Sequence, residues 1–285
     1  MRRSRSRPNR LAGFVTLFLA VSAPAPAQTQ ITFTPVQKEI VLARFQDVPD
    51  KNAERQHKIK ALFVEAGCGD FVSEQRLKHS DYSNVICRLP GETEEVIIVG
   101  AHFDKVVNGT GAIDNWSGAS LLASLYQSLI AAKRHHTFLF ISFCEEERGL
   151  IGSEFYASHM SNDDIARTEA MINLDTLGLS PTKIWVHNAD KNLVGALASV
   201  SQALHLPASE MDIERVGSSD SESFAGKHIP RITIHSLTQK TFPILHTRDD
   251  TPKQLHPDDY YDTYRLLSGY LVFLDGTLQP RTAAK

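Results

Sequence analysis

The chain has 285 residues, of which 42% are hydrophobic and 22% are charged, and its formal net charge is -3 at pH 7. A sequence of this length and composition can bury the core of one large domain, and no internal repeat, low-complexity tract or Gly/Ser linker divides it. The acidic balance argues against nucleic acid or an anionic membrane as the main binding partner.

Residues 1–27 have the three parts of a secretory signal peptide. Five arginines precede an apolar stretch from Leu11 to Ala23, and Ala25 and Ala27 supply the small residues of a cleavage site. The apolar stretch is shorter than the roughly 20 residues that a membrane anchor needs. We therefore expect a secreted or periplasmic protein that starts near Gln28, has no membrane contact after cleavage and forms one domain over residues 28–285. Cleavage removes five of the 30 basic residues and none of the 33 acidic ones, which leaves a net charge of about -8.

Residues 35–66 are predicted to form two helices, because their apolar residues recur at helical spacing. These helices, within residues 28–70, are expected to pack on the rest of the domain. A hairpin follows, flanked by Cys68 and Cys87, and an odd number of three cysteines in an exported protein suggests one disulfide and one free thiol. We predict a Cys68–Cys87 disulfide, with two reduced thiols as the alternative, and expect Cys144 to be a small buried residue.

Buried strands and helices alternate from residue 95 onward. Apolar runs predict strands at 95–104, 137–143, 170–175, 183–187 and 231–236. Helices are predicted within 116–134, through 153–156, over 191–204 and over 260–274. The first of these helices has four leucines on one face, as an amphipathic helix does. The alternation indicates an α/β fold, a three-layer α/β/α sandwich with a mixed, mostly parallel central sheet.

Three of the predicted strands end in polar side chains of one kind. The strand at 95–104 ends in His102 and Asp104, the strand at 137–143 is followed by the glutamates 145–147, and another strand ends in Asp175. Charged side chains are almost never fully buried unless they are paired or hold a metal. Because ligands bind beyond the carboxyl ends of the strands in open α/β sheets, we expect these groups to meet at one edge of the sheet.

The residue types at this edge suit metal ions better than a nucleophile. The sequence has no G-x-S-x-G, no H-E-x-x-H, no phosphate-binding glycine loop and no paired C-x-x-C. The remaining candidates are nitrogen and oxygen ligands, and zinc is the commonest hydrolytic ion for such a set. Five ligands are too many for one open zinc site, but they fit two ions that share a carboxylate and activate a bridging water.

The sequence resembles peptidase family M28, a family of zinc-dependent aminopeptidases. Six stretches carry the resemblance, in family order and within residues 95–250: VGAHFD (99–104), GAIDNWSG (111–118), EERGLIGS (146–153), NLDTLG (173–178), SSDSESFAGKHIP (218–230) and HTRDD (246–250). Each stretch alone is a weak signal, whereas six in order are a strong one. The resemblance implies the zinc-dependent exopeptidase fold.

The resemblance also implies how the three glutamates divide their roles. The family pattern E-E-x-G-L-x-G-S aligns with residues 146–153, which makes Glu146 the general base and Glu147 a metal ligand. Adjacent side chains on extended backbone point apart, so one can face a metal ion while the other reaches the water. Glu145 is then the extra carboxylate, and we expect a surface charge that is solvated or paired with an arginine near a helix start.

The remaining site residues follow from the same resemblance. The implied ligand set has one pair for each of two zinc ions and one bridging carboxylate: His102 with Asp175, Glu147 with His246, and Asp114. Asp104 matches the aspartate that the family uses to orient the first histidine. A carboxylate in this position fixes the tautomer of the imidazole ring.

The sequence departs from the family pattern near residue 220. Asp220 matches an acidic position, but Ser221 stands where the family has histidine, and Val216 lies near the place of a tyrosine that some members have. These differences concern the groups that stabilise the transition state and shape the substrate pocket. His187 and His235 end apolar strands and match no ligand of the family.

The leading interpretation is a secreted aminopeptidase with two zinc ions, which hydrolyses peptides with a free N-terminus. Glu146 takes a proton from the bridging water and passes it to the leaving amine. The alternative is a glutaminyl-peptide cyclotransferase of the same fold with one zinc, because FPILHTRDD resembles cyclases as well. A third class, a binding module that has lost its ligands, is disfavoured because all five ligand positions and the base are present. The sequence indicates no oligomeric state.

Overall fold

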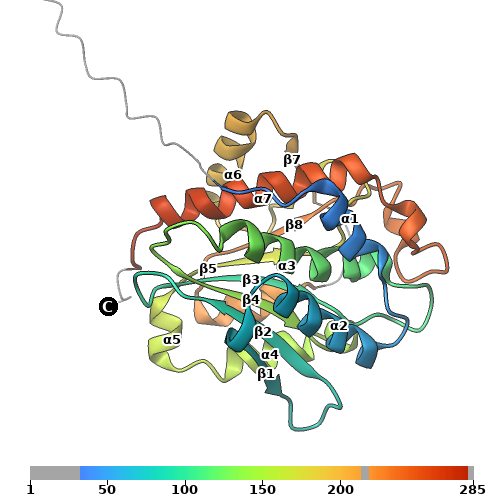
Figure 1. The fold of residues 1–285 in the computed structure, drawn as a ribbon, viewed down its shortest axis with the longest axis horizontal. Helices are drawn as coiled ribbons and strands as arrows, with labels where there is room; N and C mark the ends of the chain where they lie inside the picture. Colours follow the sequence, from blue (N-terminus) through green and yellow to red (C-terminus); the bar gives the residue numbers. More distant parts are fainter. Residues whose placement is uncertain (1–32, 213–217, 282–285) are drawn as a thin grey trace, which may run out of the picture. The chain divides into compact units, whose positions relative to one another are not determined.

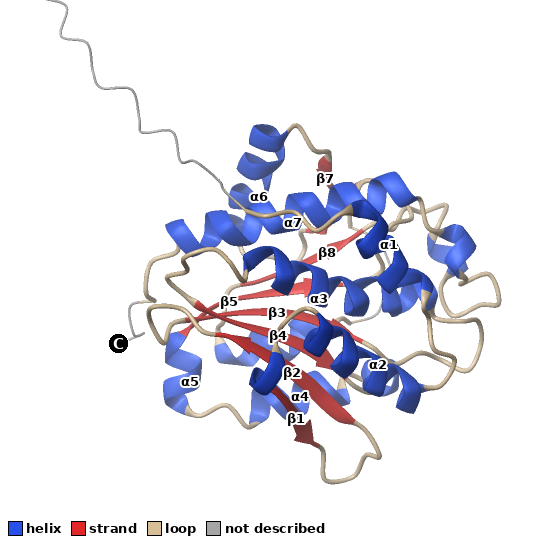
Figure 2. Ribbon diagram, in the orientation of Figure 1, coloured by secondary structure: helices blue, strands red, loops and turns tan. Residues whose placement is uncertain are grey.

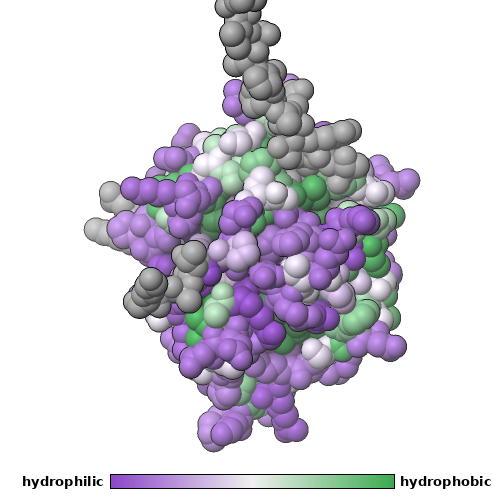
Figure 3. Space-filling model, turned by 90° about the vertical axis from the view of Figure 1, so that its left-hand side faces the viewer, coloured by the Kyte–Doolittle hydropathy of each residue, from purple (hydrophilic) through white to green (hydrophobic). Residues whose placement is uncertain are grey.

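The computed structural model describes residues 33–212 and 218–281 of the chain. The predicted signal peptide and Val216 lie outside the described residues. Among the helices of these two segments, none is both long enough and apolar enough to cross a membrane. Figure 3 shows a mainly hydrophilic face with scattered apolar residues, as expected for a surface in contact with water.

The described residues form one mixed sheet of eight strands in the order β1-β2-β4-β3-β5-β8-β6-β7. The strands are β1 (Val72–Arg76), β2 (Ser83–Leu89), β3 (Val96–His102), β4 (Thr137–Phe143), β5 (Thr168–Leu174), β6 (Thr182–Trp185), β7 (Ala208–Glu210) and β8 (Arg231–His235). The four central strands β4, β3, β5 and β8 are parallel, and β2 and β6 join them in antiparallel pairing. The predicted mixed, mostly parallel sheet is confirmed.

Helices cover both faces of the sheet (Figures 1 and 2). The helices α1 (Lys38–Gln46), α2 (Asn52–Glu65), α3 (Ser117–Leu129), α6 (Lys191–Leu204) and α7 (Pro257–Thr277) pack in one core, and α4 (Ile151–Ser158) packs in a second, with α5 (Asn162–Arg167) beside it in the figures. On β3, Ile97 and Val99 enter the first core while Val96 and Ile98 enter the second. Because successive side chains of a strand point to opposite faces, every residue of β3 is buried. The three layers are as predicted.

The helix α3 differs from its prediction in one respect. We expected an amphipathic helix with one apolar face, but every residue except Gln127 is buried. The reason is that α1, α2 and α7 cover the side of α3 that faces away from the sheet. The serines on that side are satisfied by neighbouring helices: Arg44 Nη1 donates to Ser124 Oγ at 3.0 Å, and Ser128 Oγ donates to Ser268 Oγ at 3.2 Å.

The predicted hairpin and its disulfide are both present. The strands β1 and β2 pair antiparallel, and Cys68 is bonded to Cys87. Cys144 is free and buried, as expected. Burial raises the pKa of its thiol, so it behaves as a small packed side chain and not as a nucleophile.

Two short elements escaped the prediction. The helix α5 is capped by Ser161, whose hydroxyl accepts from the Asp164 N–H while the Asp164 carboxylate accepts from the Ser161 N–H. This Ser-x-x-Asp spacing is a helix-start signal that was readable in the sequence. The strand β7 has three residues and no alternating pattern, so its position is set by pairing with β6.

Candidate metal centre

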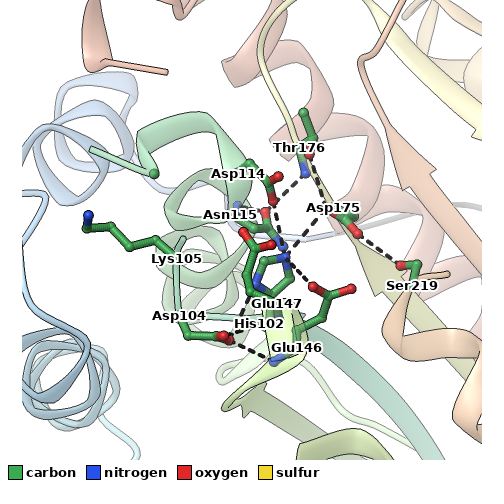
Figure 4. A network of polar contacts seen from close by, with 12 residues as sticks. His102, Asp104, Lys105, Asp114, Asn115, Glu146, Glu147, Asp175, Thr176 and Ser219 are labelled. Atoms are coloured by element: carbon green, nitrogen blue, oxygen red, sulfur yellow. Dashed lines mark hydrogen bonds and ion pairs between the residues drawn. The ribbon is translucent and has the colours of Figure 1, made fainter. Parts of the chain in front are cut away.

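Most of the predicted site residues lie close together at the carboxyl ends of the parallel strands, and Figure 4 labels His102, Asp104, Asp114, Glu146, Glu147 and Asp175. His102 is the last residue of β3, the turn Glu146–Arg148 follows β4, and Asp175 directly follows β5. The other two come from loops. Asp114 lies in the turn Ala112–Trp116 before α3, and His246 follows the turn Phe242–Ile244. The parallel topology therefore brings together residues that lie up to 144 positions apart in the sequence.

These side chains form two clusters that share Asp114. In the first, His102 Nε2 lies 3.3 Å from Asp114 Oδ1 and 3.8 Å from Asp175 Oδ1. In the second, His246 Nε2 lies 3.1 Å from Asp114 Oδ2 and 3.0 Å from Glu147 Oε2. Each cluster has one ligand atom per residue within 4.8 Å of the others. Asp114 thus directs one oxygen to each cluster, which is the arrangement of a bridging carboxylate.

Of the adjacent residues Glu146 and Glu147, only Glu147 belongs to a cluster. Glu146 Oε2 is 3.9 Å from His102 Nε2 and belongs to neither cluster. Asp104 holds the turn, because its carboxylate accepts from the Glu146 N–H at 3.0 Å and from the Glu147 N–H at 3.2 Å. Its Oδ1 is 3.6 Å from His102 Nδ1, which is longer than a hydrogen bond. Asp104 therefore lies beside the histidine, as predicted, but its hydrogen bonds go to the glutamate turn.

The prediction that Glu145 is a surface charge is wrong. Its side chain is paired with an arginine as expected, since Arg148 Nη1 donates to Glu145 Oε1 at 2.7 Å. The residue is nevertheless only 3% exposed. The reason lies in the backbone, which turns left-handed at Glu145 (φ 55°) and then accepts the Ile151 N–H, so the residue closes the turn between β4 and α4.

The electrostatics of the site favour positive charge at both histidines. Burial alone would lower the pKa of His102, yet Glu146, Asp104, Asp114 and Asp175 raise it well above its ordinary value. Hydrogen bonds to Asp114 and Glu147 raise the pKa of His246 to about 10. Among the described residues, no lysine or arginine lines this part of the cavity. Carboxylates packed this closely need cations, and a divalent ion between the ligands supplies more charge than a proton does.

Several hydrogen-bonding partners of the ligands were not predicted. Ser219 Oγ donates to Asp175 Oδ2 at 2.9 Å, and Thr176 Oγ1 donates to Asp175 Oδ1 at 3.1 Å. Asn115, fully buried, accepts the Thr176 N–H at 3.1 Å and donates to the Leu174 carbonyl at 2.8 Å, which ties the Asp114 turn to the end of β5. Asn115 and Ser219 lie inside two of the stretches that carry the family resemblance. Their place in these stretches was the one signal in the sequence that could have identified them.

Asp220 is fully buried, and neither of its oxygens has a hydrogen-bond partner within residues 33–212 and 218–281. Burial raises its pKa to about 7. Ser221, which stands where the family has histidine, is bonded to Thr233 through their hydroxyls at 2.8 Å. The serine that replaces the family's histidine thus forms a hydrogen bond between two uncharged side chains, Ser221 and Thr233.

A cavity of about 400 Å³ opens from the ligands. Beyond the two clusters and Glu146, its described lining is apolar at Trp185, Leu237, Phe242, Pro243 and Leu245 and polar but mostly uncharged at Thr176, Ser218, Thr233 and His235. His235 is neutral, because burial lowers its pKa to about 4. Both of its nitrogens are engaged, Nε2 with the Met211 carbonyl at 2.9 Å and Nδ1 with the Leu237 N–H at 3.0 Å. The cavity thus has a charged end and a largely neutral end.

Comparison with known sequences identifies relatives over most of this region. The sequence profile of peptidase family M28 matches residues 84–271. Among curated proteins, aminopeptidase YwaD of Bacillus subtilis (strain 168) is 30% identical over 165 residues, which are 55% of this chain and 36% of that protein. The chain spans about a third of the length of the first curated relatives it matches.

Two solved structures illustrate the similarity of fold. BSAP, a zinc aminopeptidase from Bacillus subtilis, superimposes with a TM-score of 0.61 at 23% identity, over 67% of this chain and 49% of that chain. A glutaminyl cyclase from an Acidobacteriales bacterium superimposes with a TM-score of 0.69 at 17% identity, over 90% of this chain and 99% of that one. At these identities the two structures establish the fold, which peptidases and cyclases share.

Proposed function

Because the chain belongs to peptidase family M28, we propose that it is a secreted aminopeptidase that holds two zinc ions and removes the N-terminal residue of peptides. The observation that carries the proposal is the pair of clusters that share Asp114. A zinc aminopeptidase is among the solved structures of similar fold.

The donor set fits two zinc ions. His102, Asp114 and Asp175 would hold one ion, and Asp114, Glu147 and His246 the other, all through the nitrogen and oxygen atoms that zinc accepts. Glu147 Oε1 is buried and has no hydrogen-bond partner among the described residues, so a cation would satisfy it. When bound, the ions would polarise the peptide carbonyl and lower the pKa of a water molecule.

Glu146 is the proposed general base. Its carboxylate lines the cavity next to the ligands without belonging to either cluster. Burial raises its pKa, and of its charged neighbours His102 opposes that change while Asp220, Asp175 and Asp114 add to it. With positive charge bound in the two clusters the carboxyl group would be ionised, and it would take a proton from water and return it to the departing amine. Asp104 keeps it there by binding the N–H groups of the turn.

The cavity supports a substrate with a free amino group and a neutral N-terminal side chain. The carboxylates at the charged end attract an ammonium group. The other end offers apolar surface from Trp185, Leu237 and Phe242, and among its polar groups Thr233 and His235 are bonded within the protein. We expect large apolar residues such as leucine or phenylalanine to be removed faster than charged ones.

The cyclase alternative needs one zinc, which a single cluster would hold. The convergence of two clusters on Asp114 favours the peptidase, since a single-zinc enzyme leaves the second cluster without a role. The experiment is a panel of aminoacyl p-nitroanilides together with an N-terminal glutaminyl peptide. Release of p-nitroaniline from the leucine derivative supports the peptidase. Pyroglutamyl product without p-nitroaniline release supports the cyclase, and no turnover of either supports a binding module.

A further inference from the structure

Asp250 lies behind the shared ligand Asp114 and outside the cavity. It follows His246 by four positions on the same loop and is 2% exposed. Its carboxylate accepts two consecutive backbone N–H groups, that of Ile113 at 2.7 Å through Oδ1 and that of Asp114 at 3.2 Å through Oδ2. One side chain therefore holds the two peptide groups that lead into the ligand.

The backbone of Asp250 joins the same two loops. Its carbonyl accepts from the Thr110 N–H at 2.9 Å and from the Thr110 hydroxyl at 2.8 Å. The loops approach so closely that Gly109, in the left-handed region at φ +71°, has no room for a side chain against the Thr247 carbonyl. The loop that carries His246 is thereby fixed to the loop that carries Asp114.

The turn that carries Asp114 has irregular backbone, so hydrogen bonds from neighbouring segments, such as those of Asp250, hold it in place. Asp114 (φ -107°, ψ 95°) and Asn115 (φ -134°, ψ 41°) have non-helical backbone angles just before α3. The N–H groups at a helix start have no partner within the helix and must find one elsewhere. Yet Asp114 must direct one oxygen toward His102 and the other toward His246, at 3.3 Å and 3.1 Å. A small rotation of its backbone would break one of these contacts.

The charge on Asp250 makes its position costly. Its carboxylate is buried near the carboxylate of Asp114, and the Ile113 N–H, the Asp114 N–H and the nearby Arg55 offset part of the cost. Arg55 is itself fully buried and donates to the carbonyls of Gly111 at 3.0 Å and Phe103 at 2.9 Å. A neutral residue that merely filled the space would avoid the cost of this buried carboxylate.

We propose that Asp250 is a positioning residue for the metal pair: by holding the Ile113 and Asp114 N–H groups from the His246 loop, it sets the orientation in which Asp114 reaches both clusters. This inference rests on the proposed role of Asp114 as the shared ligand. Carboxylates that support a ligand through hydrogen bonds typically contribute 10- to 100-fold to metal affinity.

The test is the affinity of the metal-free protein for Co²⁺ and Zn²⁺, measured by calorimetric and absorption titration well below the unfolding temperature. Asp250→Asn keeps the shape of the side chain but can accept through only one oxygen. We expect it to weaken binding of the metal pair about 10- to 100-fold and to change the Co²⁺ absorption spectrum. Asp250→Ser is the second variant, with the same expected loss, in case the amide does not fold.

Two controls separate positioning from general stability. Asp249→Asn is the same substitution on the adjacent, exposed residue, whose hydrogen bond to Thr247 uses only its backbone N–H. Thr110→Val removes one bond of the loop junction but leaves the Asp250 carboxylate in place. We expect Asp249→Asn to match the wild type, and Thr110→Val to unfold at a lower temperature while it keeps the wild-type metal affinity.

The outcomes distinguish this inference from the proposed function. Wild-type affinity in both Asp250 variants overturns the inference alone. An equal loss in Thr110→Val overturns it as well, because the junction of the loops and not the carboxylate would then matter. A wild-type protein that binds no divalent ion overturns both the inference and the function on which it rests.

Discussion

At the scale of single residues, substitutions of the three consecutive glutamates should have clearly different effects on zinc content and turnover. Glu146→Gln keeps the size of the side chain but cannot take a proton, so we expect both zinc ions to remain while turnover falls by about 10²- to 10⁴-fold. Glu147→Gln removes a ligand charge and should weaken one metal site, with partial recovery in excess zinc. Zinc content and turnover of the two variants are the measurements.

Glu145→Gln is the matched control for this pair. Glu145 is bonded to Arg148 and does not reach either cluster, so activity and zinc content should stay near the wild type. Because the residue is buried, a modest loss of stability is expected, of the order of 1 kcal/mol. If Glu145→Gln were instead the inactive variant with full metal content, the assignment of base and ligand would be displaced by one residue.

His235 gives the folded state a defined dependence on pH. Burial lowers its pKa to about 4, whereas the unfolded chain takes up the proton near the ordinary value of 6.5. The unfolded state therefore binds more protons between these values, so the stabilisation is complete above pH 6.5 and is lost as the pH falls to 4, by about 3 kcal/mol. His235→Gln should flatten the stability curve in this window, measured by urea unfolding in EDTA.

The exposed His79 provides the control for that experiment. His79→Gln should leave the wild-type slope unchanged. Equal slopes in His235→Gln and the wild type would show that His235 is already charged, or solvated, in the folded protein.

Some residues of the candidate site could be predicted from the sequence and others could not. All five residues of the two clusters were named from motifs, because metal-ligand chemistry restricts the residue types that such motifs carry. The contribution of Asp250 was not, since it depends on hydrogen bonds to Ile113 and Asp114, which lie 137 and 136 positions away in the sequence. Nothing in the local pattern of a pair of aspartates tells which one is buried and which, like Asp249, is exposed.

At the scale of elements, Arg55 connects α2 to the loops of the site. Its guanidinium donates to four backbone carbonyls, those of Pro49, Phe103, Thr110 and Gly111, and lies 5.6 Å from the ring centre of Trp116. Arg55→Met leaves these carbonyls without their donor. We expect it to lower the free energy of unfolding by about 2–4 kcal/mol, measured by urea titration.

An exposed arginine is the control for this substitution. Arg76→Met, on the exposed strand β1, should change the stability by less than about 0.5 kcal/mol. A small effect of Arg55→Met as well would mean that water replaces the guanidinium at these carbonyls.

Elements with a strong hydrophobic period were predictable, and elements defined by their neighbours were not. The strands β3, β4 and β5 are apolar on both faces because helices cover both, so their sequences read directly as buried strands. The helix α3 has serines on the side that faces other helices, and only the structure shows that Arg44 and Ser268 satisfy two of them. The three-residue strand β7 is too short to show a period.

At the scale of the whole molecule, the Cys68–Cys87 disulfide crosslinks the start of the hairpin to the second strand of the sheet. The bond closes a loop across a sequence separation of 19 residues, which restricts the unfolded chain and contributes about 3 kcal/mol. Reduction should therefore lower the free energy of unfolding by that amount, measured by urea unfolding with and without reductant. The Cys68→Ala/Cys87→Ala double variant should show no response to reductant, and a wild type that shows none either would contradict the contribution.

The layers of the fold followed from the order of strands and helices, because parallel strands need a connection that crosses one face of the sheet. The meeting of the ligands followed from the same rule, since the carboxyl ends of β3, β4 and β5 share one edge. The two clusters were a chemical hypothesis until the structure placed Asp114 with one oxygen toward His102 and the other toward His246. The directions of the two Asp114 oxygens depend on the backbone angles of the turn before α3, and the spacing of residues in the sequence does not reveal these angles.

The central claim is that Asp114 joins two metal sites, and the zinc stoichiometry of the purified protein tests it most directly. Native mass spectrometry of protein dialysed against zinc and then freed of excess should show two ions per chain, because both clusters have complete sets of nitrogen and oxygen ligands. A reproducible single ion in fully active protein would contradict the account and would favour the single-zinc cyclase.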